Sequence, residues 1–311
     1  MTKTALITGA YGFLGRHVAR YFSEKGFTVI GIGHGNWEEE EYVQFGIGEW
    51  KSVDITLDSL NVYAGRPDVV VHCAGGASVL NSFENPVVDF NSTVVTTHAV
   101  LEFIRTSCAQ AKLVYPSSAA VYGNVTKLPI AESASLNPAS PYGYNKMMAE
   151  VLCRSYARNF NIPVTVVRLF SVYGPGLKKQ LLWDASSKIT KAEYHFFGTG
   201  QETRDWLHVD DAVKLLLLAS SYASDNCPVV NGGGGGGATV REVLDEMFKM
   251  YKSHCKPHFT GEAKVGDPRG YVADITKAKS WGWQPSKSFH EGLAEYIKWY
   301  LDEHDKNSVH S

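Results

Sequence analysis

The sequence has no strong charge of one sign, no long apolar run and no leader before its first predicted strand. Its 311 residues carry a formal net charge of −2, which gives no electrostatic basis for binding nucleic acid or an acidic membrane. No apolar run approaches the roughly 18 residues that span a bilayer, and the N-terminus leaves no room for a signal peptide. We therefore expect a soluble, cytoplasmic protein that binds neither nucleic acid nor a membrane.

The cysteines exclude another class of site. There are five, and no two have the Cys-x-x-Cys spacing of a redox or metal centre. Such scattered thiols are typical of a reducing compartment. We expect no disulfide and no bound metal at Cys73, Cys108, Cys153, Cys227 and Cys255.

Up to about residue 170, short β-branched runs alternate with longer amphipathic segments. The predicted strands are residues 3–8, 28–33, 69–73, 112–117 and 164–169. The predicted helices include residues 16–25, 87–107 and 141–159. This alternation predicts an α/β fold, a Rossmann doubly wound parallel sheet with helices on both faces.

After Phe170 the predicted elements shorten, which indicates a smaller C-terminal α/β lobe that binds the substrate. We assign residues 1–170 and about 203–231 to the sheet domain, and residues 171–202 and 232–311 to the lobe. The glycine run at residues 232–237 is too flexible for the interior of an element and predicts a tight loop at a strand end.

Three glycines, Gly9, Gly12 and Gly15, lie between the first predicted strand and the first helix. A dinucleotide pyrophosphate needs a turn without side chains, because backbone N–H groups and the helix N-terminus must approach its phosphates. A purely structural turn is the alternative, but the position favours a cofactor site. The predicted cofactor contacts in this segment are Gly9, Tyr11, Gly12, Phe13, Leu14 and Gly15.

The end of the second strand usually selects between NAD and NADP. Gly33 stands where an aspartate would bind the adenosine ribose, and His34 follows it. Together with Arg16, His34 is placed to face a 2′-phosphate, so the cofactor is NAD or NADP with a slight preference for NADP. Asp54 and Ile55, after the next strand, are placed to meet the adenine.

Tyr142 and Lys146 are four residues apart and share one face of a predicted helix. A tyrosine with an ordinary pKa of about 10 is a poor base at neutral pH. A lysine ammonium beside it favours the phenolate. Exposed helical pairs of this kind are common, so the pair alone leaves a catalytic and a surface role equally open.

Ser117 and Ser118 end the strand that precedes this helix. Ligands of open α/β sheets lie just outside the carboxyl ends of the strands. The Ser118 hydroxyl is therefore placed to hydrogen-bond the substrate oxygen on which Tyr142 acts. Capping of a turn is the alternative role, but the glycine turn makes the coincidence difficult to explain by structure alone.

With these motifs the sequence resembles the extended short-chain dehydrogenases/reductases, and within them the NAD-dependent epimerase/dehydratase family of sugar-nucleotide enzymes. The resemblance covers nearly the whole chain. Besides the glycine turn, its segments are residues 71–75, 117–123, 140–146, 168–175, 200–211 and 266–269.

The resemblance implies a catalytic triad of Ser118, Tyr142 and Lys146 and a nucleotide-diphosphate sugar as substrate. It implies cofactor contacts by Cys73, Ala74, Gly75 and Thr93. It implies substrate contacts by Ser117, Ser118, Ser171, Trp183, Arg204, Lys264 and Asp267, with Arg204 on the diphosphate. A homodimer formed through the two long helices is implied as well.

Four positions depart from the family pattern. Ala119 and Ala120 replace the Asp-Glu pair of the 4,6-dehydratases, and methyl groups cannot supply the acid and base that eliminate water. Ser171 and Thr93 replace asparagines. Trp183 stands where relatives meet the base or sugar, although a packing tryptophan is equally expected.

A nucleotide-sugar 4-epimerase fits this pattern best. An NADPH-dependent 4-ketoreductase of 4-keto-6-deoxy sugars remains as the alternative, and a non-catalytic dinucleotide-binding regulator comes third.

Overall fold

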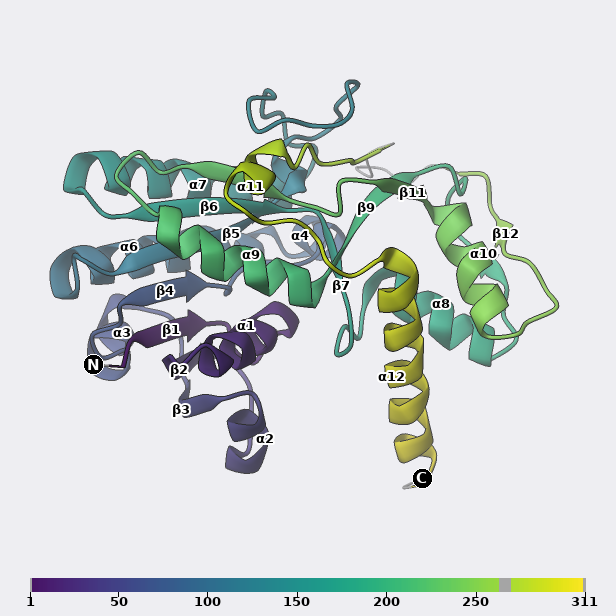
Figure 1. Ribbon diagram of the computed structural model, residues 1–311, viewed down its shortest axis with the longest axis horizontal. Helices are drawn as coiled ribbons and strands as arrows, with labels where there is room; N and C mark the ends of the chain where they lie inside the picture. The colour runs from purple at the N-terminus through teal and green to yellow at the C-terminus, as the bar shows by residue number, and fades with distance from the viewer. Residues whose placement is uncertain (1, 263–269, 310–311) are drawn as a thin grey trace.

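A seven-stranded parallel sheet forms the larger part of the molecule (Figure 1). The computed structural model describes residues 2–262 and 270–309. Across the sheet the strand order is β10-β6-β5-β4-β1-β2-β3. The strands are β1 (Thr4–Thr8), β2 (Thr28–Gly33), β3 (Ile47–Ser52), β4 (Val69–His72), β5 (Lys112–Ser118), β6 (Val164–Leu169) and β10 (Val229–Gly232). The predicted doubly wound parallel sheet is confirmed.

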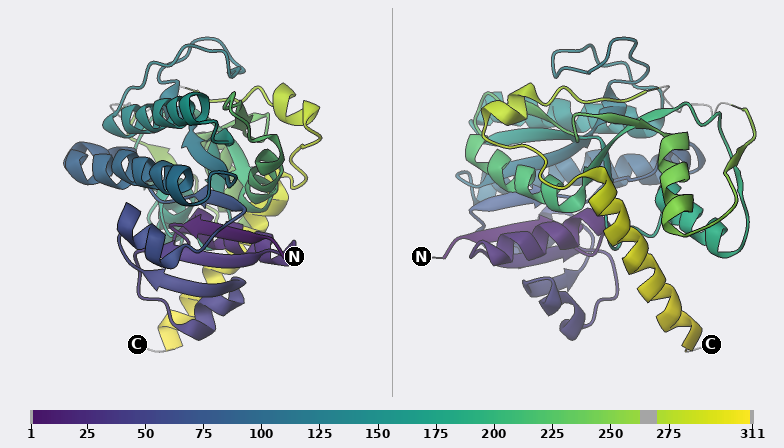
Figure 2. Two further views of the ribbon diagram at one scale, coloured as in Figure 1. Left: turned by 90° about the vertical axis from the view of Figure 1, so that its left-hand side faces the viewer. Right: turned by 45° about the vertical axis from the view of Figure 1, so that its right-hand side comes forward.

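Alternating side chains of the strands supply two separate cores. In β1, Ala5 and Ile7 pack into one core and Leu6 into the other, on the opposite face. Helices α1 (Phe13–Glu24) and α9 (Val209–Tyr222) cover the first face. Helices α3 (Leu57–Tyr63), α6 (Thr96–Ser107) and α7 (Pro141–Phe160) cover the second, which gives the three layers visible in Figure 2.

One predicted helix is interrupted. Residues 87–107 form α5 (Pro86–Phe90), a π-helical turn η1 (Asn91–Val95) and then α6. The Thr96 hydroxyl donates to the Ser92 carbonyl at 2.6 Å, and the Thr97 hydroxyl donates to the Thr93 carbonyl at 2.6 Å. Hydroxyls that bond back four residues compete with the helical ladder and bend it, and the sequence pattern does not report this.

Short elements connect the layers. They are α2 (Glu39–Gln44), α4 (Val79–Glu84), the 3₁₀ turn η2 (Ala119–Val121) and α11 (Thr276–Ser280). No helix among the described residues is both long enough and apolar enough to cross a membrane.

A smaller lobe lies beside the sheet, to the right in Figure 1. It contains a three-stranded sheet in the order β11-β9-β7 and a two-stranded sheet, β12-β8. Its strands are β7 (Ser171–Tyr173), β8 (His195–Phe196), β9 (Thr203–His208), β11 (Gly237–Thr239) and β12 (His258–Phe259). Its helices are α8 (Gln180–Thr190), α10 (Val240–Met250) and α12 (Phe289–Val309), which projects toward the C-terminus.

Two features refine the predicted division of the chain. The glycine run connects the end of β10 to the start of β11, as a loop between strands. Ala273, Ala278 and Trp283 pack into the core under α1 and α9, although we assigned them to the lobe. The chain therefore returns to the large sheet once more before α12.

Candidate active site

A cavity of about 1500 Å³ runs from the glycine turn, past the carboxyl ends of β4 and β5, to α8 and β9 of the lobe. Because β4 lies on the opposite side of β1 from β2, the chain changes direction here, where ligands of doubly wound sheets bind. Of the predicted site residues that the structure describes, all but Thr93 and Trp183 line this cavity.

Thr93 lies behind the cavity wall and is fully buried. Its Oγ1 accepts a hydrogen bond from the Gly76 N–H at 2.8 Å. The residue therefore holds the segment after β4 in place from behind the cavity wall, and its predicted cofactor contact stays a prediction.

The glycine turn has the close packing that a dinucleotide site needs. Gly9 has a φ of +66°, and a Cβ there would lie 2.7 Å from the Ala74 nitrogen. A Cβ on Gly15 would lie 2.8 Å from the Ala10 Cα. A side chain on Gly9 would push the turn away from the segment after β4, and one on Gly15 would push α1 away from the turn. The residues present therefore fit a bound pyrophosphate.

At the adenosine end, Arg16 is enclosed by aromatic rings. Its guanidinium carbon lies 5.4 Å from the Tyr11 ring centre, 5.3 Å from Trp37 and 5.2 Å from Phe45, and the group donates to the Tyr11 carbonyl at 2.6 Å. Burial lowers the pKa of this guanidinium. His34 is paired with Asp54, with Nε2 and Oδ1 2.7 Å apart.

The predicted catalytic pair lies at the start of α7. Ser140 caps this helix through the Gly143 N–H at 3.2 Å, and Pro141 occupies its first turn. Lys146 is 6% exposed and donates to the Pro116 carbonyl at 3.2 Å. Burial lowers the pKa of this ammonium to about 8, so its charge is sensitive to nearby groups.

Tyr142 and Ser118 meet in the cavity. Burial raises the pKa of the Tyr142 phenol, and a hydrogen bond from Ser118 counteracts part of this effect. The Lys146 ammonium lies 6.0 Å from the centre of the Tyr142 ring. The structure thus brings the three predicted catalytic residues together.

Ser117 lines the cavity, but its hydroxyl is turned toward the interior of the protein. It is 4% exposed, and its hydroxyl donates to Glu150 of α7 at 2.6 Å. The same carboxylate accepts two bonds from Arg168 of β6, at 3.0 and 2.7 Å. The Ser117 hydroxyl therefore supports β5 and α7 from the interior, and the predicted substrate contact of this residue stays a prediction.

At the lobe end, Ser171 and Arg204 line the cavity. Trp183 does not: it packs against α12, with its ring centre 5.0 Å from Tyr300 and 6.1 Å from Trp299, so the packing alternative is correct. Lys264 and Asp267 lie outside the described residues.

Several further residues of the lobe line the cavity and were missed from the sequence, among them Phe197 and Lys179. Phe197 is 51% exposed there, directly after β8. The sequence could have indicated Phe197 through its neighbour Phe196, which is buried. Adjacent residues of a strand face opposite sides, so one of two neighbouring phenylalanines is expected to face away from the core. Lys179 precedes α8, and partial burial lowers the pKa of its ammonium.

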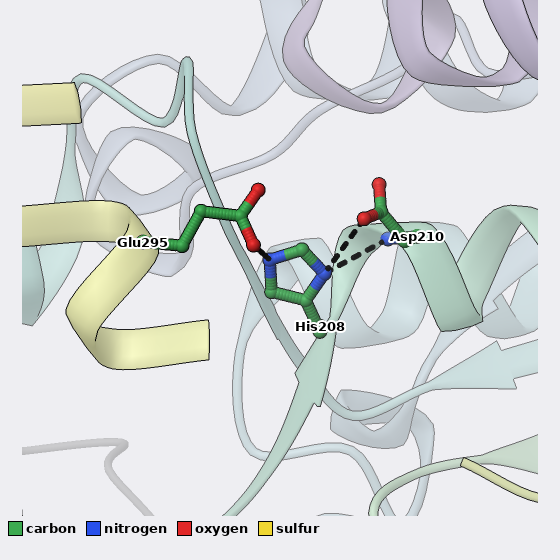
Figure 3. A group of neighbouring side chains, drawn as sticks. All are labelled: His208, Asp210 and Glu295. Atoms are coloured by element: carbon green, nitrogen blue, oxygen red, sulfur yellow. Dashed lines mark hydrogen bonds and ion pairs between the residues drawn. The ribbon is translucent and has the colours of Figure 1, made fainter. Parts of the chain in front are cut away.

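Figure 3 shows a separate group, in which His208 lies between Glu295 of α12 and Asp210 of α9. The two carboxylates approach different ring nitrogens, at 3.8 Å from Nε2 and 3.5 Å from Nδ1. The Lys287 ammonium bonds both Asp210, at 3.0 Å, and Glu295. The Lys287 ammonium, together with Arg20 at 4.0 Å from Asp210, already pairs with these acids, so the group is an ion-pair cluster that attaches α12 to the sheet domain.

Comparison with known proteins agrees with this geometry. The model of the NAD dependent epimerase/dehydratase family matches residues 5–231. A Methanocaldococcus jannaschii protein, provisionally named as a UDP-glucose 4-epimerase, is 33% identical over 94% of this chain and 97% of its own length.

Solved structures give the same result. The Thermotoga maritima UDP-glucose 4-epimerase with UDP-glucose has a TM-score of 0.87 and 27% identity, over 97% of this chain and 99% of that one. MoeE5 in complex with UDP-glucuronic acid and NAD has a TM-score of 0.86 and 27% identity, over 96% and 99%. The resemblance is confirmed: the chain belongs to the NAD-dependent epimerase/dehydratase family.

Proposed function

We propose that this protein is an NAD-dependent nucleotide-sugar 4-epimerase that acts on a UDP-sugar. The observation that carries the proposal is the meeting of Ser118, Tyr142 and Lys146 in one cavity, with Ala119 and Ala120 next to them. This set can remove and return a proton at one carbinol, but it lacks the acid and base of a dehydratase. Relatives named as 4-epimerases of UDP-glucose and UDP-glucuronate support the substrate class.

In the proposed reaction Tyr142 takes the proton of the hydroxyl on carbon 4, while Ser118 hydrogen-bonds the same oxygen. Bound NAD supplies the hydride acceptor and a positive charge that favours the Tyr142 phenolate. Lys146 adds a second positive charge beneath it. The cavity would have to let the 4-keto sugar turn so that its other face meets the cofactor, and Tyr142 would then return the proton to the oxygen on carbon 4. Arg204 and Lys179 line the lobe end of the cavity, where their charges suit a diphosphate.

NAD is the proposed cofactor, although Gly33 and His34 alone favoured NADP. The aromatic cage of Arg16 leaves its guanidinium turned toward Tyr11, and His34 is already paired with a carboxylate. A 2′-phosphate would face the charge of Asp54. Asp54→Asn is expected to raise the affinity for NADP relative to NAD, measured by fluorescence titration. Tighter binding of NADP than NAD by the wild-type protein would contradict this assignment.

The epimerase itself is tested by incubating the purified protein with UDP-glucose, UDP-glucuronate or UDP-N-acetylglucosamine and following the 4-epimer by NMR. We expect interconversion of one pair without net change in the cofactor. Tyr142→Phe should abolish it while cofactor binding persists. Stoichiometric oxidation of NADPH with a 4-keto-6-deoxy sugar nucleotide would instead identify the ketoreductase. A Tyr142→Phe variant with unchanged function would favour the non-catalytic regulator.

We also propose a cytoplasmic homodimer. Tyr144, Met148 and Val151 form an exposed stripe on α7, and Val87 is exposed on the neighbouring helix α5. Such an apolar face suits a second copy of the chain. Sedimentation should report a dimer that Val151→Glu converts to a monomer, whereas a monomeric wild-type protein would refute the proposal.

The unpaired state of the cysteines is in keeping with a reducing compartment.

A further inference from the structure

Asp89 of α5 is a buried carboxylate directly behind the wall of the active-site cavity. It is 2% exposed, and its Oδ2 accepts a hydrogen bond from the Asn145 side chain at 2.7 Å. Its Oδ1 is buried and has no hydrogen-bond partner among the residues that the structure describes. A buried acceptor that is left unpaired costs free energy, so a residue of this kind calls for an explanation.

The position of Asp89 relative to the cavity is specific. A Cβ built on Gly76 would overlap the Asp89 Oδ1, so the carboxylate lies against the backbone of a residue that lines the cavity. Thr93, one helical turn later, accepts the Gly76 N–H. Asn145 immediately precedes Lys146 on α7. Asp89 thus joins the segment after β4 to the catalytic helix.

The charge of Asp89 acts on both members of the catalytic pair. It raises the pKa of the Tyr142 phenol in addition to the larger effect of burial. It also raises the pKa of the Lys146 ammonium, against the burial that lowers it to about 8. Cys73, Glu150 and Cys153 also act on Lys146, and each favours its charged form. His72 interacts electrostatically with Lys146 as well, and the Tyr115 ring centre lies 5.1 Å from the ammonium.

We propose that Asp89 is a positioning residue for the catalytic pair. Through Asn145 it holds α7 against the segment after β4, and its negative charge favours the cationic form of the buried Lys146. The part of this inference that concerns turnover rests on the proposed function. The part that concerns the ionisation of Tyr142 does not.

The test compares Asp89→Asn, which keeps an acceptor for Asn145 but loses the charge, with Asp89→Ala, which loses both. Glu84→Gln is the matched control, because Glu84 is exposed on the adjacent helix α4. In Asp89→Asn we expect both limbs of the pH profile of kcat/KM to move to lower pH. In Asp89→Ala we expect turnover to fall about ten- to hundredfold, as for a misplaced catalytic group. Glu84→Gln should match the wild type in both.

A second measurement does not depend on turnover. The ultraviolet absorbance of tyrosinate is titrated in the wild type, Asp89→Asn and Tyr142→Phe, and the difference from Tyr142→Phe isolates Tyr142. Its titration should move to lower pH in Asp89→Asn. An unchanged Tyr142 titration or an unchanged pH profile overturns the inference, as does a loss of turnover in Asp89→Ala that the loss of folded protein fully explains. If the wild type turns over no sugar nucleotide, the proposed function fails and the tyrosinate titration alone decides the role of Asp89.

Discussion

The ion pair between Glu150 of α7 and Arg168 of β6 lies behind the catalytic residues and gives a quantitative prediction. The two side chains are 2% and 3% exposed, and two hydrogen bonds, of 3.0 and 2.7 Å, join them. Glu150→Ala leaves the Arg168 guanidinium buried without its carboxylate. It also removes the acceptor of the Ser117 hydroxyl.

Removing one partner of a buried pair typically costs about 3–5 kcal/mol of unfolding free energy. Unfolding entropy is about 2.1 cal/mol/K per residue, which makes each kcal/mol equivalent to about 1.5 °C in Tm for a chain of this length. Glu150→Ala should therefore lower the Tm by about 5–8 °C. The surface pair of Glu102 and Arg105 has comparable geometry but lies at the surface of α6. Glu102→Ala should cost less than about 1 kcal/mol.

Differential scanning calorimetry of the two variants, and of the double variant Glu150→Leu/Arg168→Met, measures these differences. The double variant should recover most of the loss, because apolar residues of similar volume can replace a buried pair at little cost. The reasoning is refuted if Glu150→Ala and Glu102→Ala lower the Tm equally. It is also refuted if the double variant is less stable than Glu150→Ala.

Three further variants address other parts of the molecule. Gly15→Ala places a Cβ against the backbone of Ala10 and should abolish NAD binding in a fluorescence titration, and near-normal affinity would contradict the tight packing of the turn. Burial lowers the pKa of Lys146 to about 8, so its ammonium is lost as pH rises through that value. The kcat/KM of the wild type should therefore fall above pH 8, whereas that of an active Lys146→Arg variant should not. Lys287→Met leaves Glu295 without its ammonium partner and should lower the free energy that attaches α12 by about 1 kcal/mol. Limited proteolysis should then cleave α12 faster than in the wild type, and equal rates would argue against the ion-pair cluster.

The strands of the large sheet are predictable because their side chains carry the pattern of a sheet buried on both faces. The ranges 28–33 and 164–169 agree with β2 and β6 at both ends. The strand β3 was missed, since at the edge of the sheet its half-exposed sequence lacks an apolar run. The break of the helix at residues 91–95 depends on hydroxyl bonds to the backbone, which no apolar period records.

The glycines and the Ser118 hydroxyl that line the cavity in the sheet domain were found because backbone geometry dictates them. Glycines between β1 and α1, and hydroxyls at the end of β5, have few other reasons to be there. Trp183 was ambiguous, since an aromatic on a short helix can face either the ligand or the core. Asp89 was missed altogether, because its importance comes from Asn145, which lies 56 residues away in sequence.

The two serines at the end of β5 connect the stability of the fold to the chemistry of the site. Adjacent residues of a strand face opposite sides, so Ser117 reaches Glu150 in the interior while Ser118 reaches Tyr142 in the cavity. The buried ion pair therefore fixes the register that presents Ser118. Variants of the ion pair should lower the Tm and the turnover together, whereas Ser118→Ala should lower turnover and leave the Tm near that of the wild type. If Ser118→Ala were as destabilising as Glu150→Ala, the hydroxyl would belong to the structural network and the division of labour between the two serines would be wrong.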